Sequence, residues 1–398
     1  MRMMHGFPPE PEAQVTTENW RLPPQSRWGF CNMRQLFPTA GLTRSSCPSH
    51  LLERPSDLAQ VLLLNRVGVE RPLDTILREE NTNGFIVLHK GKIVMEWYDG
   101  FLKSNTLHTV QSISKSIAAL VAGILIERKC LSDQANVIDY IPELAHSGFG
   151  SAKVRHLLDM TTSLAFNEDL ADPNGDSVKF RSATTGTPKR EDVKVIGLRK
   201  ALQQIGHGGG AHGDRFHYVT ANTDVLGWVL ERASGRPYVE LVQELLWDPL
   251  GAEHEACLLL DVYAAPRAGG GISMTLRDLA RVGEMIRCMG SFNNHQIVPK
   301  RWLQDMLANG DKEAWARGPR SGVIKGPYRS NFYLLGAGNE PLLAGIGSYG
   351  QWLYVDIARD TVIARFASES VGTDPIRLSD WQRIFYSIAC QLDSKVNL

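Results

Sequence analysis

The spacing of apolar residues divides the chain into segments of different periodicity. Residues 85–89 and 93–98 are rich in β-branched and aromatic side chains and flank Lys90-Gly91-Lys92, which predicts a β-hairpin. From residue 112 to residue 130 the apolar positions recur at three- and four-residue intervals, as expected of a buried helix. The same spacing predicts further helices over residues 154–160, 192–205, 222–233, 238–247, 276–289 and 299–307.

The last part of the chain returns to strand patterns. Residues 331–337, 351–357 and 361–368 predict strands, and a helix is predicted over residues 379–392. Strands and helices do not alternate along the chain, which argues against a doubly wound parallel fold. The order instead predicts an α+β protein. Its antiparallel sheet is built from both chain ends and flanked by helices, and a mostly helical region is inserted between those ends.

This order also predicts how the chain is divided. Residues 1–55 have little periodicity and many Pro, Arg and Ser residues, which predicts an extended N-terminal arm. Residues 56–150 and 311–398 are expected to form the α/β body, and residues 151–310 a mostly helical domain. Within that domain, residues 167–190 are polar and rich in Gly, Pro, Thr and Asp, so they predict a functional loop or lid.

Composition excludes several classes of protein. The 398 residues are 43% hydrophobic, and 43 Lys and Arg balance 43 Asp and Glu, which is typical of a globular protein rather than a basic nucleic-acid binder. The longest apolar run is shorter than the roughly 18 residues of a membrane span. The first residues lack the apolar segment of a secretory signal, and the six cysteines include no Cys-x-x-Cys pair. We therefore expect a cytoplasmic protein with reduced thiols.

Ser112 and Lys115 form the first candidate for chemistry. A Lys placed three residues after a Ser on a helix returns to the same face, within reach of the hydroxyl. A buried Lys can be neutral and can then act as a base toward the Ser. The helix N-terminus would add positive potential for a developing oxyanion. The alternative is a helix with an ordinary Ser near its start and a surface Lys.

Tyr218 and a glycine-rich segment are two further candidates. A Tyr hydroxyl can relay a proton if cations nearby lower its pKa, although Tyr218 could equally be a core residue before a helix capped by Asn222 or Thr223. Residues 345–350 fit the G-x-G-x-x-G dinucleotide pattern, but a strand rather than a helix is predicted after them. A glycine-rich strand could instead offer a backbone N–H group to an oxyanion, or could simply contain a bulge.

Two other segments are weaker candidates. His207-Gly208-Gly209-Gly210 is similar to the oxyanion loop of α/β-hydrolases, but the chain has no G-x-S-x-G nucleophile motif, so a surface loop is expected. Residues 253–257 contain Glu, His and Cys in a spacing that matches no defined metal site, so a solvated turn is expected.

Taken together, the motifs resemble a known superfamily. Ser112-x-x-Lys115, Tyr218 and Gly345-x-Gly347, in this order, are similar to the serine β-lactamases and penicillin-recognising enzymes, in their class C and esterase branch. Residues 154–162 and 270–281 agree with that branch. Within it the chain most resembles the 6-aminohexanoate-dimer hydrolases of nylon-oligomer breakdown. That likeness extends from residues 20–44 through residues 167–169 and 221–226 to residues 345–351.

This resemblance implies a β-lactamase-like fold with the site between the body and the helical domain. It implies that Ser112 is the acylated nucleophile, that Lys115 activates it, and that Tyr218 passes a proton to the leaving group. The backbone N–H groups of Ser112 and Ser348 would form the oxyanion hole, with no metal or cofactor required. Asn222 would be a possible organiser of this group. The substrate-binding positions that it implies are Asn167, Glu168, Leu170, Arg181, Asn222, Gly269, Gly347 and Tyr349.

The chain also departs from its relatives. Gly345 stands where many of them have Lys or His, so the anchor for a β-lactam carboxylate is missing and penicillin hydrolysis is not expected. The dimer hydrolases have a Tyr at the position of Leu170, an Asp near Arg181 and an Asn at the position of Gly269. These departures concern contacts to an amide leaving group and a substrate ammonium. Ester cleavage, which needs less leaving-group assistance, is expected to survive them.

The sequence therefore predicts a serine hydrolase that cleaves small linear amides, 6-aminohexanoate-dimer-type oligomers first, through an acyl-enzyme. A short-chain carboxylesterase is the alternative. A non-catalytic binding module with the same fold and a nucleotide-binding enzyme are further alternatives. The expected partner is a small-molecule amide or ester, with no nucleic acid or membrane, and a homodimer is left open.

Overall fold

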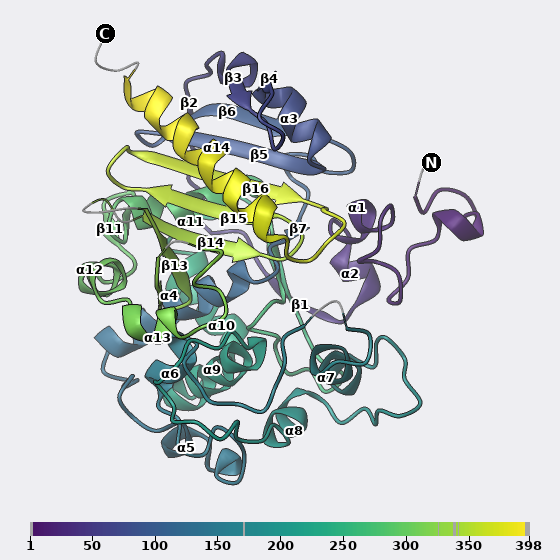
Figure 1. Ribbon diagram of the computed structural model, residues 1–398, viewed down its shortest axis with the longest axis vertical. Helices are drawn as coiled ribbons and strands as arrows, with labels where there is room; N and C mark the ends of the chain where they lie inside the picture. The colour runs from purple at the N-terminus through teal and green to yellow at the C-terminus, as the bar shows by residue number, and fades with distance from the viewer. Residues whose placement is uncertain (1–2, 170–171, 325, 337–339, 341, 395–398) are drawn as a thin grey trace.

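A large mixed sheet dominates the computed structural model, which describes residues 3–169, 172–324, 326–336, 340 and 342–394 (Figure 1). Neighbouring strands are antiparallel except for β2, which pairs parallel with β6. Strand β16 lies beside β5, so both parts of the chain contribute to one sheet, as predicted. The order across the sheet is β12 (Tyr328–Arg329), β13 (Phe332–Leu335), β14 (Leu342–Gly347), β15 (Gln351–Asp356), β16 (Thr361–Ala367), β5 (Thr82–His89), β6 (Lys92–Tyr98) and β2 (Leu52–Glu53).

Helices cover both faces of this sheet. Helices α14 (Pro375–Ser394) and α3 (Leu73–Glu79) pack on one face, and α11 (Leu276–Arg287) and α4 (Ile113–Glu127) on the other (Figure 1). Side chains alternate between the faces: Trp352 and Tyr354 of β15 contact Phe385 of α14, whereas Leu353 packs near α11. Because both faces are covered, the central strands are buried at every position.

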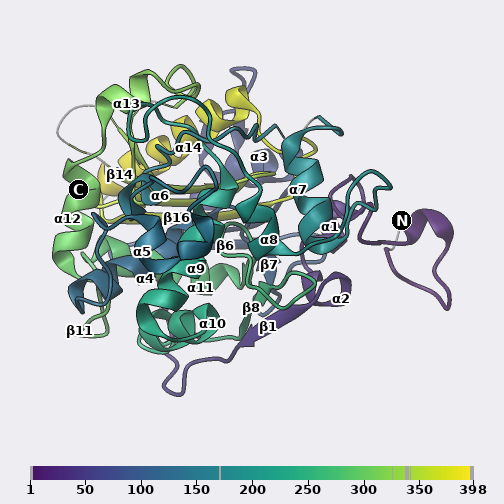
Figure 2. The ribbon, with the colours of Figure 1, turned by 90° about the horizontal axis from the view of Figure 1, so that it is seen from below.

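Helix α4 lies at the junction between the sheet and the helical region. Its residues from Ile113 to Leu125 are all buried, since it contacts α9 and α10 as well as β14 and β15. Its helical neighbours are α5 (Val137–Tyr140), α6 (Val154–Leu158), α8 (Leu198–Gln203), α9 (Thr220–Ser234), α10 (Tyr238–Val242) and a π-helical turn, η4 (Gln243–Trp247). Figure 2 shows these helices gathered on one side of the sheet.

A second, four-stranded sheet links the N-terminal arm to the start of α4. Its order is β1 (Thr39–Leu42), β8 (Ala256–Leu259), β9 (Ile272–Met274) and β7 (His108–Thr109). Strand β1 belongs to the arm, and β7 leads within a few residues to Ser112. The small sheet therefore brings the arm close to the N-terminus of α4.

Most predicted elements are confirmed, but three segments differ. The arm is not simply extended: it contains short helical turns and its own apolar cluster, in which Trp20, Phe30 and Met33 pack together. The predicted loop 167–190 includes helix α7 (Asp176–Thr185). The helix predicted over residues 192–205 is confined to α8, because Gly197 has a φ of 78° and interrupts it. Helices of only one or two turns are too short to produce a clear helical periodicity in the sequence.

The remaining elements are short. They are η1 (Pro11–Ala13), α1 (Ser26–Gly29), α2 (Met33–Leu36), η2 (Leu58–Gln60), β3 (Leu62–Leu64), β4 (Glu70–Pro72), η3 (Pro142–Leu144), β10 (Ser291–Phe292), β11 (His295–Gln296), α12 (Lys300–Ala308) and α13 (Lys312–Ala316). All six cysteines are free thiols. None of the helices in the described ranges is long and apolar enough to cross a membrane. The division into arm, body and helical domain stays a prediction, and α11 from the middle of the chain packs on the sheet.

Candidate active site

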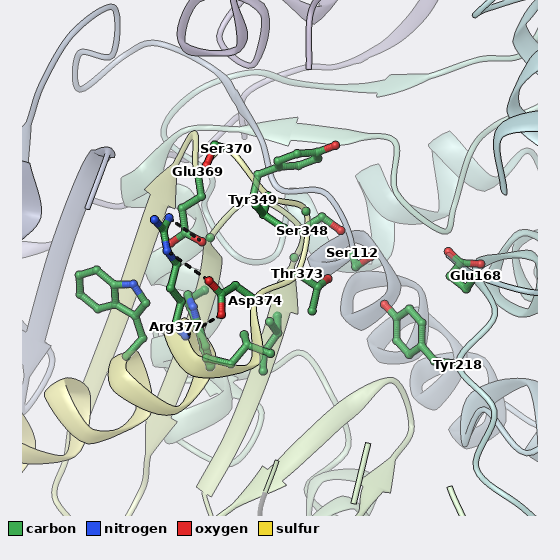
Figure 3. A pocket seen from close by; sticks show the side chains of 18 of the residues that line it. Ser112, Glu168, Tyr218, Ser348, Tyr349, Glu369, Ser370, Thr373, Asp374 and Arg377 are labelled. Atoms are coloured by element: carbon green, nitrogen blue, oxygen red, sulfur yellow. Dashed lines mark hydrogen bonds and ion pairs between the residues drawn. The ribbon is translucent and has the colours of Figure 1, made fainter. Parts of the chain in front are cut away.

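Ser112 stands at the N-terminus of α4, directly after a tight turn. Gln111 has a φ of 48°, in the left-handed region that a residue other than glycine rarely adopts. This conformation reverses the chain between β7 and α4, and Ser112 reaches the surface of a cavity (Figure 3). The positive end of the α4 dipole then lies beside the hydroxyl.

Lys115 is buried beside Ser112, with only 1% of its surface exposed. Its Nζ lies 3.0 Å from Ser112 Oγ and donates a 2.5 Å hydrogen bond to the Gly269 carbonyl oxygen. Burial lowers the pKa of Lys115 to about 8, and the charge of Arg320 acts in the same direction, against Glu168 and Asp224. A substantial fraction of Lys115 is therefore neutral in mildly alkaline solution and able to accept the Ser112 proton.

Tyr218 precedes α9, and its side chain lies beside Ser112 at the cavity (Figure 3), near enough for Ser112 to act on its pKa. Two cations face its ring: Arg320 Cζ is 4.0 Å and Lys115 Nζ 5.2 Å from the ring centroid. A proton relay through Tyr218 was expected if such cations lowered its pKa. Burial outweighs them, however, and raises the pKa of Tyr218 to about 12. Tyr218 is thus protonated at neutral pH and can donate a hydrogen bond or a proton.

The end of β14 packs against the turn that precedes Ser112. A Cβ atom at Gly347 would lie 2.5 Å from the Val110 carbonyl oxygen, so glycine permits this approach. The contact places Ser348 beside Ser112 at the rim of the cavity, as Figure 3 shows. Strand β15 follows rather than a helix, so the context of a dinucleotide-binding motif is absent from residues 345–356.

Gly269 and Glu168 are held by α9. The Gly269 N–H group donates to Asp224 at 2.8 Å, and a Cβ atom at Gly269 would lie 2.7 Å from Thr220 Cγ2. This close packing fixes the carbonyl oxygen that accepts from Lys115. The Glu168 carboxylate accepts hydrogen bonds from the backbone N–H group of Thr220, at 3.0 Å, and from its hydroxyl.

Two cavities meet at Ser112. The larger measures about 470 Å³ and is lined by Tyr218, Arg320 and residues 369–374, whereas the smaller measures about 120 Å³. Residues of the smaller cavity include Phe180, Arg181 and Gly269. Both are lined by Arg21, Ser112, Glu168, Ser348 and Tyr349. The site therefore offers two separate spaces for the two parts of a substrate joined at one bond.

Comparison with known proteins identifies the family. A family model described as Beta-lactamase matches residues 79–385. The chain belongs to the beta-lactamase family. It is therefore a hydrolase of the serine hydrolase superfamily. The Ser112-x-x-Lys115 pair, on which the family resemblance rests, lies at the start of α4.

Individual members of the family span the chain to different extents. A 6-aminohexanoate-dimer hydrolase of Paenarthrobacter ureafaciens is 33% identical over 367 residues, covering 91% of this chain and 90% of the relative. Esterase EstB of Burkholderia gladioli is 29% identical over 194 residues, covering 45% of this chain and 48% of the relative.

Solved structures show the same fold. A Bacillus anthracis protein, named as a candidate 6-aminohexanoate-dimer hydrolase, superposes with a TM-score of 0.88 at 24% identity, covering 98% of this chain and 99% of its own. A family VIII carboxylesterase gives a TM-score of 0.58 at 16% identity, covering 79% of this chain and 95% of its own. Because these identities are low, the two structures support a conclusion about the fold only. The fold is β-lactamase-like, as predicted.

The structure brings together most of the site residues that the family resemblance implies. Glu168, Arg181, Gly269, Gly347 and Tyr349 line one cavity or both. Leu170 lies outside the described residues. The close approach of Val110 to Gly347 and of Thr220 to Gly269 also explains why these two positions have no side chain.

Asn167 and Asn222 lie outside both cavities. Asn222 is fully buried, accepts a 2.7 Å hydrogen bond from Thr162 and donates to the Met160 sulfur at 3.3 Å. It therefore holds α9 against the segment after α6, and its side-chain hydrogen bonds go to Thr162 and Met160 rather than to Lys115. The Asn167 backbone N–H group donates to Asp176 at the start of α7. Asn167 supports the shape of this loop.

The two weaker candidates are not part of the site. Gly209 and Gly210 are exposed, and the Gly210 N–H group donates to Ser163. Of residues 253–257, the last two enter strand β8 and are buried, so the expected solvated turn is shorter than predicted. In the part of the chain that the structure describes, no three His, Cys, Asp or Glu side chains are grouped to hold a metal ion.

Sequence reasoning missed two arginines near the site. Arg320 follows α13 in a segment without a motif, yet it covers the Tyr218 ring and donates to the Tyr333 hydroxyl. Arg365 is fully buried, and its guanidinium donates to the Gly350 carbonyl oxygen at 2.9 Å and to Glu369 at 2.7 Å. It thereby fixes the turn after Ser348. The only signal for Arg365 was a charge inside an apolar strand pattern.

Proposed function

We propose that the protein hydrolyses small linear amides of the 6-aminohexanoate-dimer type through an acyl-enzyme on Ser112. The observation that carries this proposal is the 3.0 Å contact between Lys115 Nζ and Ser112 Oγ at the N-terminus of a buried helix. Burial both keeps the pair in contact and lowers the pKa of Lys115 to about 8.

The groups around Ser112 support each step of acyl transfer. Neutral Lys115 accepts the Ser112 proton as Oγ attacks the carbonyl carbon, and the backbone N–H groups of Ser112 and Ser348 stabilise the oxyanion. Tyr218 donates its proton to the departing nitrogen or oxygen, and Lys115 returns a proton to Tyr218. Water then attacks the acyl-enzyme, releasing the acid and restoring the Ser112 hydroxyl.

The amide preference rests on a relative that is 33% identical along 91% of the chain and is named a 6-aminohexanoate-dimer hydrolase. The second candidate, a short-chain carboxylesterase, is supported by the match to esterase EstB over 45% of the chain. The smaller cavity, about 120 Å³, suits a short linear chain in either case. The contact of Lys115 with Ser112 and the closeness of Lys115 to the Tyr218 ring argue against a non-catalytic binding module.

Intact-mass measurement during turnover tests this proposal. Wild type and Ser112→Ala are each mixed with p-nitrophenyl hexanoate and with 6-aminohexanoate dimer. We expect a transient mass increase equal to one acyl group, with product release, in wild type only. Ser151→Ala, which changes an exposed serine outside both cavities, serves as the matched control and is expected to behave as wild type.

The rates on the two compounds then separate amidase from esterase. Faster turnover of the dimer supports the amide proposal, whereas turnover restricted to the ester supports the carboxylesterase. Absence of acylation and turnover with both compounds contradicts the proposal and favours the binding module. Acylation that persists in Ser112→Ala would place the nucleophile elsewhere.

A further inference from the structure

The position of Tyr218 indicates which part of a substrate each of the two cavities at Ser112 would hold. Tyr218 lines the larger cavity but not the smaller one. Because Tyr218 protonates the leaving group in the proposed mechanism, the leaving group occupies the larger cavity. The acyl chain that stays bonded to Ser112 then extends into the smaller cavity.

The smaller cavity combines apolar walls with positive charge. Its walls are formed by the side chains of Trp20, Phe37, Phe166, Phe180, Leu259 and Leu260. Three arginines, Arg21, Arg181 and Arg267, also line it. The walls suit methylene groups, and the arginines suit an anion at the end of an acyl chain.

The three arginines differ in their partners. Arg267 is paired, because it lies 3.3 Å from Asp224 and donates to Thr184 at 3.1 Å. Arg181 on α7 is half-buried, and its guanidinium forms no hydrogen bond or ion pair with any residue that the structure describes. Burial is the largest influence on the pKa of Arg181 and lowers it, Arg267 acts in the same direction, and Tyr349 and Glu18 act against them. The Arg181 guanidinium is therefore available to bind an anionic ligand in this cavity.

Other groups that line the smaller cavity also favour an anionic ligand. Arg21 stacks on Trp20, with Cζ 4.4 Å from the ring centroid, and its buried Nε has no hydrogen-bond partner among the described residues. The Tyr349 hydroxyl lies close enough for Arg181 to lower its pKa, although burial raises that pKa overall. Glu168, the acidic residue of this cavity, is engaged through both carboxylate oxygens by Thr220 and so is less available to a cation.

We infer that the smaller cavity binds an acyl chain ending in a carboxylate and that Arg181 is its specificity residue. Within the small linear amides and esters of the proposed function, this makes monoamides and monoesters of short dicarboxylic acids better substrates than the 6-aminohexanoate dimer, whose acyl chain ends in an ammonium. This inference rests on the proposed acyl transfer by Ser112. A guanidinium can hold a carboxylate through two parallel hydrogen bonds, while the aromatic walls exclude water from the chain.

Three p-nitrophenyl esters with six-carbon acyl groups test the inference: the adipate monoester, the hexanoate and the 6-aminohexanoate. In wild type at low salt we expect kcat/KM to be highest for adipate and lowest for 6-aminohexanoate. Arg181→Met is expected to reduce kcat/KM for adipate about 10- to 100-fold, the range for losing a hydrogen bond to a charged group. Its activity on neutral hexanoate is expected to change about two- to threefold at most. Arg181→Asp is expected to favour 6-aminohexanoate.

Lys179→Met is the matched control, because Lys179 is an exposed cation on the same helix and lies outside both cavities. It is expected to keep the wild-type order of substrates. Wild type that prefers hexanoate to adipate, or an Arg181→Met variant that keeps the wild-type ratio, overturns the inference.

Equilibrium binding separates this inference from the proposed function. Adipate and hexanoate are titrated into Ser112→Ala protein with and without Arg181→Met, so the readout does not need turnover. We expect adipate to bind more tightly than hexanoate only when Arg181 is present. If all three esters resist hydrolysis while this binding difference holds, the proposed function fails and the anion site stands. Equal binding of the two acids overturns the anion site.

Discussion

Lys115 and Arg365 are both buried cations near the site, but they differ in the acceptors that surround them. Arg365 keeps its proton and is surrounded by acceptors, including Thr82 at 3.0 Å and Glu369 at 2.7 Å. Lys115 has fewer partners, and burial lowers its pKa to about 8. A residue with such a shifted pKa beside a serine in a cavity is a candidate for chemistry, whereas Arg365 is a positioning residue.

The pH dependence of ester hydrolysis follows from Lys115. Only the neutral amine accepts the Ser112 proton, so kcat/KM for p-nitrophenyl hexanoate is expected to rise as pH increases through about 8. It should then stay level until Tyr218, with a pKa of about 12, begins to ionise. Steady-state rates measured from mildly acidic to alkaline pH, corrected with Ser112→Ala as the blank, give this profile.

Replacement of Lys115 tests its role as the general base. Lys115→Arg stays charged and is expected to lose about 10²- to 10⁴-fold in kcat/KM at every pH, the usual contribution of a general base. A flat wild-type profile between mildly acidic and alkaline pH, or a Lys115→Arg variant with the wild-type profile, would contradict the role of Lys115.

At the scale of elements, the oxyanion site depends on contact between β14 and the turn before α4. The strand reaches this turn because Gly345 and Gly347 lack side chains, and a Cβ atom at Gly347 would meet the Val110 carbonyl oxygen at 2.5 Å. Helix α9 makes a comparable close approach at Gly269. Geometry around Ser112 is therefore set by backbone packing of three elements that are distant in sequence.

Gly347→Ala is expected to push β14 away from Ser112. Overpacking of this kind costs about 1–3 kcal/mol of unfolding free energy, and kcat should fall because the Ser348 N–H group moves. Denaturant unfolding and ester kinetics measure both effects. Gly322→Ala, at an exposed glycine with open space around the added Cβ, is the control. Unchanged stability and kcat in Gly347→Ala would show that β14 tolerates a methyl group here.

At the scale of the whole molecule, the N-terminal arm completes the site. It contributes Trp20, Arg21 and Phe37 to the smaller cavity. Arg27 pairs with Asp99 at 2.9 Å, and β1 pairs with β8, so ion pairs and strand pairing both attach the arm to the rest of the chain. In both views α7, which carries Arg181, lies on the same side of the molecule as the arm (Figures 1 and 2).

Disturbing the arm should therefore affect substrate binding more than chemistry. A Cβ atom at Gly29 would lie 2.6 Å from the Trp20 carbonyl oxygen, so Gly29→Ala is expected to displace Trp20 and raise KM for p-nitrophenyl hexanoate more than it lowers kcat. Gly41→Ala is the control within the same arm, since its added Cβ would meet only Arg34, at 3.9 Å. An unchanged KM in Gly29→Ala would show that the arm does not shape the site.

Local patterns along the chain were enough to predict the features that depend on neighbouring residues. Strand and helix periodicity predicted β5, β6, β15, β16 and α4, because each pattern is repeated within one element. The contact of Ser112 with Lys115 followed from their spacing on one helix face. The resemblance then supplied Tyr218 and Ser348, whose places in the site local patterns could not give.

Properties that arise between distant segments could be seen only in the folded chain. The burial that lowers the pKa of Lys115, the cover of Tyr218 by Arg320 and the place of Arg181 in the smaller cavity depend on which segments pack together. Asn222 looked like a site residue in sequence but faces Thr162 and Met160. The physical reason is that periodicity is a local property, whereas burial and electrostatic environment are sums over neighbours that only the fold brings together.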